Sequence, residues 1–203
     1  MTQDLDDGTL DQILEAARSL IAEEGYAALT MGALARAAKL PLAVIYRHTP
    51  DRPALMAAFI RRIDLKVLER LPDWSEADSP RERLFDLLMA RFDQLLQEKD
   101  MLRVMQKDLR RMPGEALLMA PVLIRAMRWM AEAAGLPTGG LKGAARVRAL
   151  AAAYASVLPV WLSDEDPGHA KTMAALDRRL RRIEGLWSDV WGGKPSDKAA
   201  PAA

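Results

Sequence analysis

Cysteine is absent from this 203-residue chain, so neither a disulfide nor a thiolate metal site can form. Aromatic residues make up only 5% of the sequence, which disfavours β-strands as the main element. No apolar run approaches the roughly 18 residues that a membrane-spanning helix needs. The acidic start, MTQDLDDGTLDQ, is the opposite of a secretory signal. We therefore expect a cytoplasmic protein with no membrane span and no metal.

Half of the residues are apolar, and the abundance of Ala, Leu, Arg and Met favours helices. Apolar residues spaced by three and four predict an all-α chain of about nine helices. The predicted helices cover residues 9–26, 31–38, 41–48, 52–71, 81–99, 101–112, 114–134, 142–163 and 169–191.

Turn and cap signals divide the chain into parts. We expect a small N-terminal domain over residues 1–50 and a larger helical bundle over 51–192, with the helix in 51–71 as the connector. The tail, 193–203, lacks apolar periodicity, and we expect it to be disordered. The predicted helix caps are Thr9, Thr30, Asp51 and Asp100, together with a capping box between Ser79 and Glu82.

Charge is distributed unevenly along the first third of the chain. Residues 1–29 contain one Arg and seven acids, whereas residues 30–70 contain eight Lys or Arg and three acids. A basic surface suits contact with phosphates, but a solvated helix face gives the same pattern.

The segment LTMGALARAAKLPLAVIYRHTPDRPALMAAF, residues 29–59, has the outline of a helix, a tight turn, a short helix and a longer one. A short helix fits the major groove of DNA when a partner helix braces it across the backbone. Small residues at the turn let the two helices approach closely, and Ala33, Ala35, Ala37 and Ala38 supply them. Thr30, at a helix N-terminus, can offer its N–H and hydroxyl groups to a phosphate.

Residues 10–60 resemble the TetR family of bacterial transcriptional regulators. The resemblance is carried by the sequence Glu-Glu-Gly-Tyr at 23–26, by Ile-Tyr-Arg-His at 45–48, and by Leu55 and Phe59. It implies a helix-turn-helix domain, a homodimer, and double-stranded operator DNA as the partner of a repressor. It also implies phosphate contacts for Tyr46, His48 and Arg52. The predicted DNA-binding residues are Thr30, Met31, Lys39, Pro41, Leu42, Ala43, Tyr46, Arg47, His48 and Arg52.

The predicted recognition helix departs from the family pattern. The family usually has Gly at the position of Lys39, polar residues at those of Pro41 and Leu42, and Phe at that of Thr49. The exposed start, Leu42 to Val44, offers no hydrogen bonds to base edges. Three alternatives remain: recognition by apolar contacts together with Arg47 and Lys39, binding through backbone and DNA shape, or loss of DNA binding.

Methionine is concentrated in the larger domain, where seven of the eleven lie between residues 89 and 130. Flexible, polarisable Met side chains suit an adaptable pocket for a small apolar or lipid-like effector, although they also serve as ordinary core. TetR relatives usually hold their ligand between the middle helices. The predicted ligand-binding residues are Met89, Phe92, Met105, Met119, Met127, Tyr154 and Trp161.

The last predicted helix carries an apolar seam with alternating steps of three and four residues. Such a seam must face other helices, either within one chain or across a dimer. In TetR relatives the last two helices of each subunit form the dimer interface. The predicted interface residues are Met173, Leu176, Leu180, Ile183, Trp187 and Val190.

The C-terminal segment VLPVWLSDEDPGHAKTMAALDRRLRRI is similar to the lipid-binding accessory family of ubiquinone biosynthesis, which shares the TetR fold. The residues that carry this second resemblance are Trp161, Asp164, Asp166, Pro167, Thr172, Leu176, Arg178, Arg179 and Ile183. It implies an alternative function: a lipid-binding accessory protein with a degenerate DNA-binding head.

Catalytic motifs are absent from the sequence. It contains two His and no Cys, and neither HExxH, a nucleophile elbow nor a phosphate-binding glycine loop occurs. We therefore expect that the protein is not an enzyme and uses no cofactor.

Overall fold

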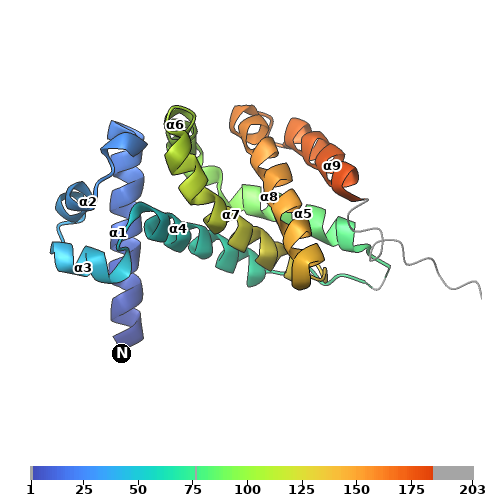
Figure 1. The fold of residues 1–203 in the computed structure, drawn as a ribbon, viewed down its shortest axis with the longest axis horizontal. Coiled ribbons are helices and arrows are strands. Elements are labelled where there is room, and N and C mark those ends of the chain that lie inside the picture. Colours follow the sequence, from blue (N-terminus) through green and yellow to red (C-terminus); the bar gives the residue numbers. More distant parts are fainter. Residues whose placement is uncertain (1, 76, 185–203) are drawn as a thin grey trace, which may run out of the picture. The chain divides into compact units, whose positions relative to one another are not determined.

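The computed structural model describes residues 2–75 and 77–184. Within these ranges the chain forms nine α-helices, two short 3₁₀ turns and no strand, which confirms the all-α prediction (Figure 1). The helices are α1 (Thr2–Glu24), α2 (Met31–Ala37), α3 (Leu42–His48), α4 (Arg52–Leu68), α5 (Pro80–Gln94), α6 (Lys99–Leu109), α7 (Pro113–Ala133), α8 (Gly140–Ser163) and α9 (Ala170–Glu184). The 3₁₀ turns are η1 (Tyr26–Ala28) and η2 (Leu96–Glu98).

Three of the predicted helix starts are confirmed by their hydrogen bonds. The side chain of Thr30 accepts from the Ala33 N–H at 3.0 Å, and that of Asp51 accepts from the Ala54 N–H at 2.7 Å. The capping box forms as well, because the Ser79 N–H donates to Glu82 at 2.8 Å. These caps satisfy N–H groups that have no partner inside the helix.

Two predicted caps are wrong. Helix α1 begins at Thr2 and runs through Thr9, since no proline precedes Thr9 to stop it. Helix α6 begins at Lys99 after Glu98, which places Asp100 in the first turn. There the negative charge of the Asp100 carboxylate still stabilises the N-terminus of α6.

The chain divides into two compact units. One contains residues 1–71 and 90–126, and the other contains residues 72–89 together with those from 127 onward. Helices α5 and α7 therefore contribute residues to both units, and α4 and α6 belong with the N-terminal helices. The boundary predicted at residue 50 stays a prediction, and the tail 193–203 lies outside the described residues.

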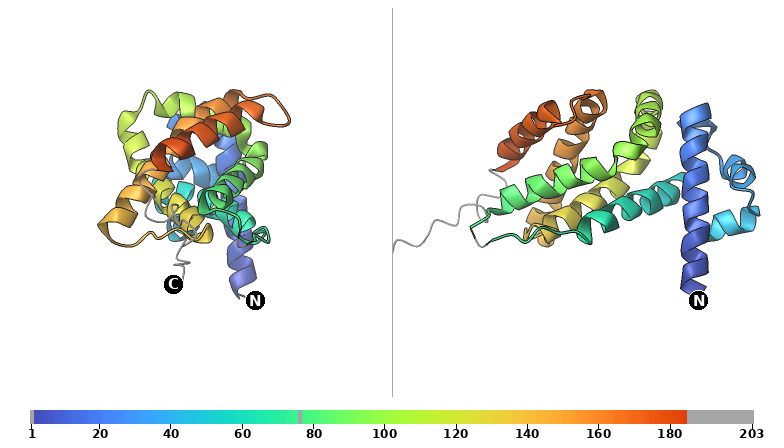
Figure 2. Two further views of the ribbon diagram at one scale, coloured as in Figure 1. Left: turned by 90° about the vertical axis from the view of Figure 1, so that its right-hand side faces the viewer. Right: turned by 180° about the vertical axis from the view of Figure 1, so that it is seen from behind.

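The first unit is built around α1. Helices α2 and α3 lie on one side of α1, and α4 and α6 lie on the other (Figures 1 and 2). Because other helices pack against both sides of α1, apolar residues occur on both of its sides. Ile13, Leu14 and Ile21 are almost fully buried. We call α1, α2 and α3 together the head.

The second unit contains the packed pair α8 and α9. Its core includes Val147, Leu150 and Val157 of α8 with Leu176 and Leu180 of α9, none of which is exposed. Helix α8 is continuous through Pro159 and α7 through Pro121.

Among the described residues, no helix is long and apolar enough to cross a bilayer.

Candidate nucleic-acid interface

The turn between α2 and α3 is closed by backbone hydrogen bonds. The Leu40 N–H donates to the Ala35 carbonyl at 3.0 Å, and the Lys39 N–H donates to the Arg36 carbonyl at 3.1 Å. Lys39 adopts a φ of 53°, the left-handed conformation that ends many helices and favours glycine. Ala38, only 2% exposed, fills the space behind the turn. The small residue and the left-handed turn let the two helices pack closely.

Helix α3 is anchored at both ends and through its buried side. Pro41 occupies the cap position and its carbonyl accepts from the Val44 N–H at 2.9 Å. Ile45 is fully buried and ties the helix to the head. At the other end, the N–H and hydroxyl groups of buried Thr49 both donate to the Ile45 carbonyl, at 2.7 and 3.3 Å. Thr49 thus stands where the family usually has Phe, without leaving an unsatisfied polar group.

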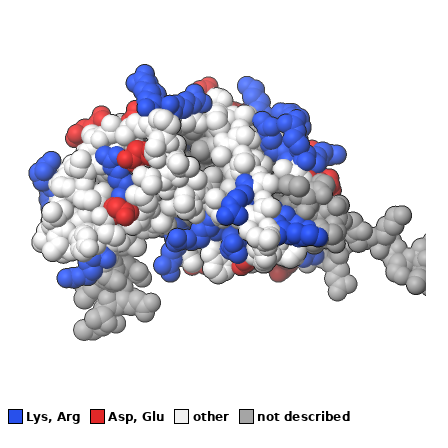
Figure 3. Space-filling view, in the orientation of Figure 1, with Lys and Arg blue, Asp and Glu red and all other residues white. Residues whose placement is uncertain are grey.

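The opposite side of α3 faces solvent. Leu42 is 55% exposed and Tyr46 is 72% exposed, and Ala43 and Arg47 are also exposed. A surface hollow of about 390 Å³ lies on this side. It is lined by Met31, Leu42, Ala43, Tyr46 and Pro50, and we call it the apolar hollow. Figure 3 shows that the surface over α2 and α3, at the left, is largely uncharged, with isolated Lys or Arg side chains at its edge.

The remaining predicted DNA-binding residues of the head are also near the surface. Thr30, Lys39 and Pro41 are exposed, whereas Met31 and His48 are partly buried. The Thr30 hydroxyl accepts the capping bond, which leaves its proton to donate elsewhere. The structure therefore brings the start of α2 and the exposed side of α3 onto one surface.

Arg52 lies at the base of the head rather than pointing outward. Its guanidinium donates to the Leu29 carbonyl at 2.6 Å, to the Ala27 carbonyl at 3.3 Å and to Glu115 of α7 at 3.1 Å. It also lies over the Tyr26 ring, 5.4 Å from its centre. Phosphate contact by Arg52 stays a prediction. The N–H groups of its guanidinium already bond to Leu29, Ala27 and Glu115, and these bonds join the head to α7.

A second contact joins the head to α6. The Tyr26 N–H donates to Asp108 at 2.8 Å. Gly25 precedes it with a φ of 91°, and a Cβ there would lie 2.9 Å from the Asp108 carboxylate. Burial raises the pKa of the Tyr26 hydroxyl to about 12, so this ring stays neutral. Sequence analysis missed Asp108 and Glu115, because neither lies in a local motif.

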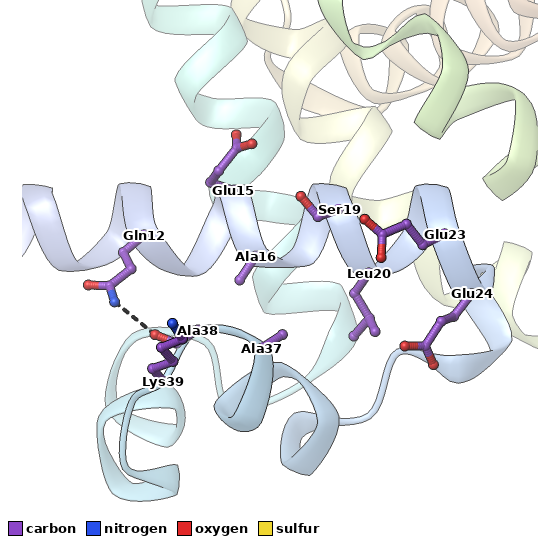
Figure 4. Close-up of a pocket in the computed structure, with 10 residues that line it drawn as sticks. All are labelled: Gln12, Glu15, Ala16, Ser19, Leu20, Glu23, Glu24, Ala37, Ala38 and Lys39. Carbon is purple, nitrogen blue, oxygen red and sulfur yellow. Dashed lines mark hydrogen bonds between the residues drawn. The ribbon is translucent and has the colours of Figure 1, made fainter.

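A surface pocket on the α1 side of the head has a different character (Figure 4). It measures about 420 Å³, and Gln12 donates across it to the Ala38 carbonyl at 2.7 Å. Its walls include the carboxylates Glu15, Glu23 and Glu24. The hydrogen bond from Arg18 lowers the pKa of Glu15 and so favours its charged form. The pocket thus has both acidic walls and Lys39, whereas no acid occurs between residues 30 and 50, so the α3 side is the better candidate for a nucleic-acid interface.

A protein-family model matches the part of the chain that contains the head. Residues 13–59 match the model of "Bacterial regulatory proteins, tetR family". These residues run from α1, through the turn described above, to Phe59 of α4. Over these residues the head is similar to that of TetR-family regulators. Residues 146–186 match a second family model, COQ9.

Solved structures show that the TetR-type fold extends over most of the chain. The TetR transcriptional regulator from Nitrosomonas europaea ATCC 19718 is 20% identical, with a TM-score of 0.61 over 87% of this chain and 98% of that chain. One from Rhodococcus sp. RHA1 is 19% identical, with a TM-score of 0.57 over 90% and 98%. Native NalD of Pseudomonas aeruginosa, the secondary repressor of the MexAB-OprM multidrug efflux pump, is 22% identical, with a TM-score of 0.52 over 87% and 96%. The search of curated proteins found no match.

The predicted ligand-binding residues are largely internal. Four of them are buried: Phe92, Met127, Tyr154 and Trp161. Met89, Met105 and Met119 are partly exposed. The Tyr26 hydroxyl donates to the Met119 sulfur at 4.0 Å, so Met119 belongs to the contacts around the base of the head. A ligand pocket among these residues stays a prediction.

The described part of the predicted dimer seam packs mainly inside its own chain. Leu176 and Leu180 are fully buried, Ile183 is partly buried and Met173 is 42% exposed. Trp187 and Val190 lie outside the described residues.

In the described ranges, no cluster of three or more His, Asp or Glu side chains is arranged to hold a metal ion.

Proposed function

We propose that this protein is a homodimeric, DNA-binding transcriptional repressor controlled by a small apolar effector. The observation that carries the proposal is the exposed side of α3, held on a TetR-type head whose caps and turn are intact. Exposed Arg47 supplies positive charge for phosphates, and the apolar side chains of Leu42 and Ala43 are exposed on the same helix.

A dimer supplies the two heads that two half-sites of an operator require. Because Leu176 and Leu180 are buried within the chain, the pairing surface must use other residues. Helix α8 offers a solvent-exposed stripe with steps of three and four residues. The stripe consists of Leu141, Ala145, Arg148, Ala152 and Ala155, and Leu141 is 92% exposed. Its three alanines allow two copies of α8 to approach closely.

Control by an effector requires that the middle helices influence the head. In the first unit, Asp108 of α6 holds the Tyr26 N–H and Glu115 of α7 holds Arg52. A buried ion pair of 2.8 Å between Arg91 of α5 and Asp64 adds a link to α4. An effector that shifts these helices would change the position of the head, and differential affinity for the two states would couple effector to DNA.

Selection from the organism's own sheared genomic DNA tests the proposal. The purified full-length protein should enrich discrete fragments, and its affinity for them should fall steeply as salt rises. A charge-reversed variant, Arg47→Glu, should lose this enrichment, whereas Arg70→Glu, at an exposed position two residues after α4 ends, should retain it. Uniform recovery of all fragments at low salt by the effector-free protein would contradict the proposal.

A second candidate function is supported by the COQ9 match over residues 146–186. Under it, the protein binds a lipid or isoprenoid beside a membrane-associated enzyme, and the head is a relic. The residues that carry this resemblance have a packing role, however. Asp164 accepts from the N–H and hydroxyl groups of Thr172 at 2.9 and 2.7 Å, and Trp161 and Leu176 are fully buried. These residues therefore also stabilise the packing of α8 against α9.

Mass spectrometry of the purified protein separates the two functions when it is combined with the DNA selection. A stoichiometric lipid together with absence of fragment enrichment would favour the accessory function. Lipid together with enrichment would instead identify the class of effector.

A further inference from the structure

The apolar hollow on the exposed side of α3 is unusual for a surface that meets a polyanion. Its lining comes from the start of α2, from α3 and from the turn that follows, and the Tyr46 hydroxyl is the only polar side-chain group among its five residues. Leu42 and Tyr46 together leave a large apolar area in water. A contiguous exposed apolar area of this kind on a folded element often marks a contact surface.

The charges around the hollow indicate what occupies it. Arg47, which follows Tyr46 on α3, is exposed, and no acid occurs between residues 30 and 50. The segment that forms the hollow therefore carries positive charge and no negative charge, which fits the phosphates of a nucleic acid better than a neutral protein surface. The size of α3, seven residues, suits a major groove.

The chemistry of the major groove then limits what the hollow can recognise. Base edges there present hydrogen-bond donors and acceptors, with one apolar exception, the C5-methyl group of thymine. Covering a donor or acceptor with Leu42 or Ala43 would leave it unsatisfied, whereas covering a methyl group removes apolar surface from water. A hollow of about 390 Å³ has room for at least one such methyl group.

We propose that the apolar hollow recognises the C5-methyl groups of thymines in the operator. Leu42, Ala43 and Tyr46 are the specificity-determining side chains, and exposed Arg47 of the same helix holds a flanking phosphate. This inference rests on the DNA binding proposed above and names the feature of DNA that is recognised. It also implies that 5-methylcytosine, which carries a methyl group at the same position, substitutes for thymine better than cytosine does.

Replacement of single thymines by deoxyuridine tests the inference, because only the methyl group is removed. In the duplex selected from genomic DNA, at least one replacement in each half-site should weaken binding by about fourfold, the effect of one buried methyl group. Placing 5-methylcytosine opposite guanine at that position should give tighter binding than unmodified cytosine.

Variants then assign the effect to the hollow. In Leu42→Ala, the deoxyuridine and thymine duplexes should bind with nearly equal affinity, because the methyl group has lost its partner. The control is Leu65→Ala, an exposed leucine of α4 that lies outside the hollow and should keep the full thymine preference.

Three results would overturn the inference. The first is specific DNA binding that no deoxyuridine replacement alters, which would leave the proposed function standing. The second is a thymine preference that Leu42→Ala retains in full. The third is absence of any specific duplex binding, which would remove the proposed function together with the inference.

Discussion

Lys39 carries a conformational cost at the turn between α2 and α3. Its φ of 53° lies in the left-handed region, where a Cβ is unfavourable. We expect Lys39→Gly to raise the free energy of unfolding by about 1 kcal/mol, because glycine adopts this conformation without strain. Urea denaturation of the two proteins measures the difference.

The matched control for this prediction is Lys39→Ala, which removes the same charge but keeps a Cβ. It should give no comparable gain in stability. Equal gains in both variants would mean that charge, and not backbone conformation, sets the cost at this position.

Arg52 provides the second test at the scale of single residues. Its side chain satisfies two backbone carbonyls and one carboxylate, a geometry that the ammonium group of lysine cannot reproduce. Arg52→Lys should therefore lower the free energy of unfolding by about 1–2 kcal/mol. If Arg52 served only as a phosphate contact, the lysine variant would unfold like the wild type. Arg47→Lys, at an exposed position, is the control and should leave stability within about 0.5 kcal/mol.

Helix caps show which parts of the elements follow from sequence alone. Thr30, Asp51 and Ser79 were predicted correctly because each cap depends on groups within three residues. The turn that exposes α3 was also predicted, from its small residues. The bonds of Arg52 to Leu29 and Glu115 were not, because the partners lie 23 and 63 residues away. No local pattern indicates which distant carbonyl a side chain will meet.

The seam of α9 illustrates a second limit. Steps of three and four residues correctly indicate that one side of the helix is buried, as Leu176 and Leu180 are. The pattern does not distinguish burial within a chain from burial between chains, since both remove the same apolar surface from water.

The turn between α8 and α9 makes stability depend on pH. The hydrogen bond from the Thr172 hydroxyl is the main cause that holds the pKa of Asp164 below its ordinary value of 3.8. Since the unfolded chain has the ordinary value, ionised Asp164 stabilises the fold above it, and this contribution disappears as the pH falls through the lower, folded-state pKa.

Asp164→Asn should therefore lower the melting temperature by a few degrees at neutral pH. The gap between wild type and variant should narrow as the pH falls below 3.8. Thermal unfolding followed by circular dichroism over a pH series measures this. Glu165→Gln, at the exposed neighbouring position, should show no such gap, and a gap in Asp164→Asn that persists unchanged into acid would contradict the account.

At the scale of the whole molecule, the exposed stripe of α8 governs assembly in the proposed dimer. Ala152→Arg places a long charged side chain where two copies of α8 would approach, so we expect a monomer. Light scattering coupled to size-exclusion chromatography gives the mass directly. The control, Ala22→Arg on α1, changes an exposed alanine of the other compact unit and should remain dimeric. Dimers of unchanged stability for Ala152→Arg would exclude this stripe.

The central claim is that the TetR-type head recognises a particular DNA sequence through the exposed side of α3. The most direct measurement is the ratio of dissociation constants for the genomically selected duplex and for a scrambled duplex of equal length and composition, at near-physiological salt. The account predicts a preference on the order of 10³-fold for the selected duplex. Equal dissociation constants for the two duplexes would contradict it.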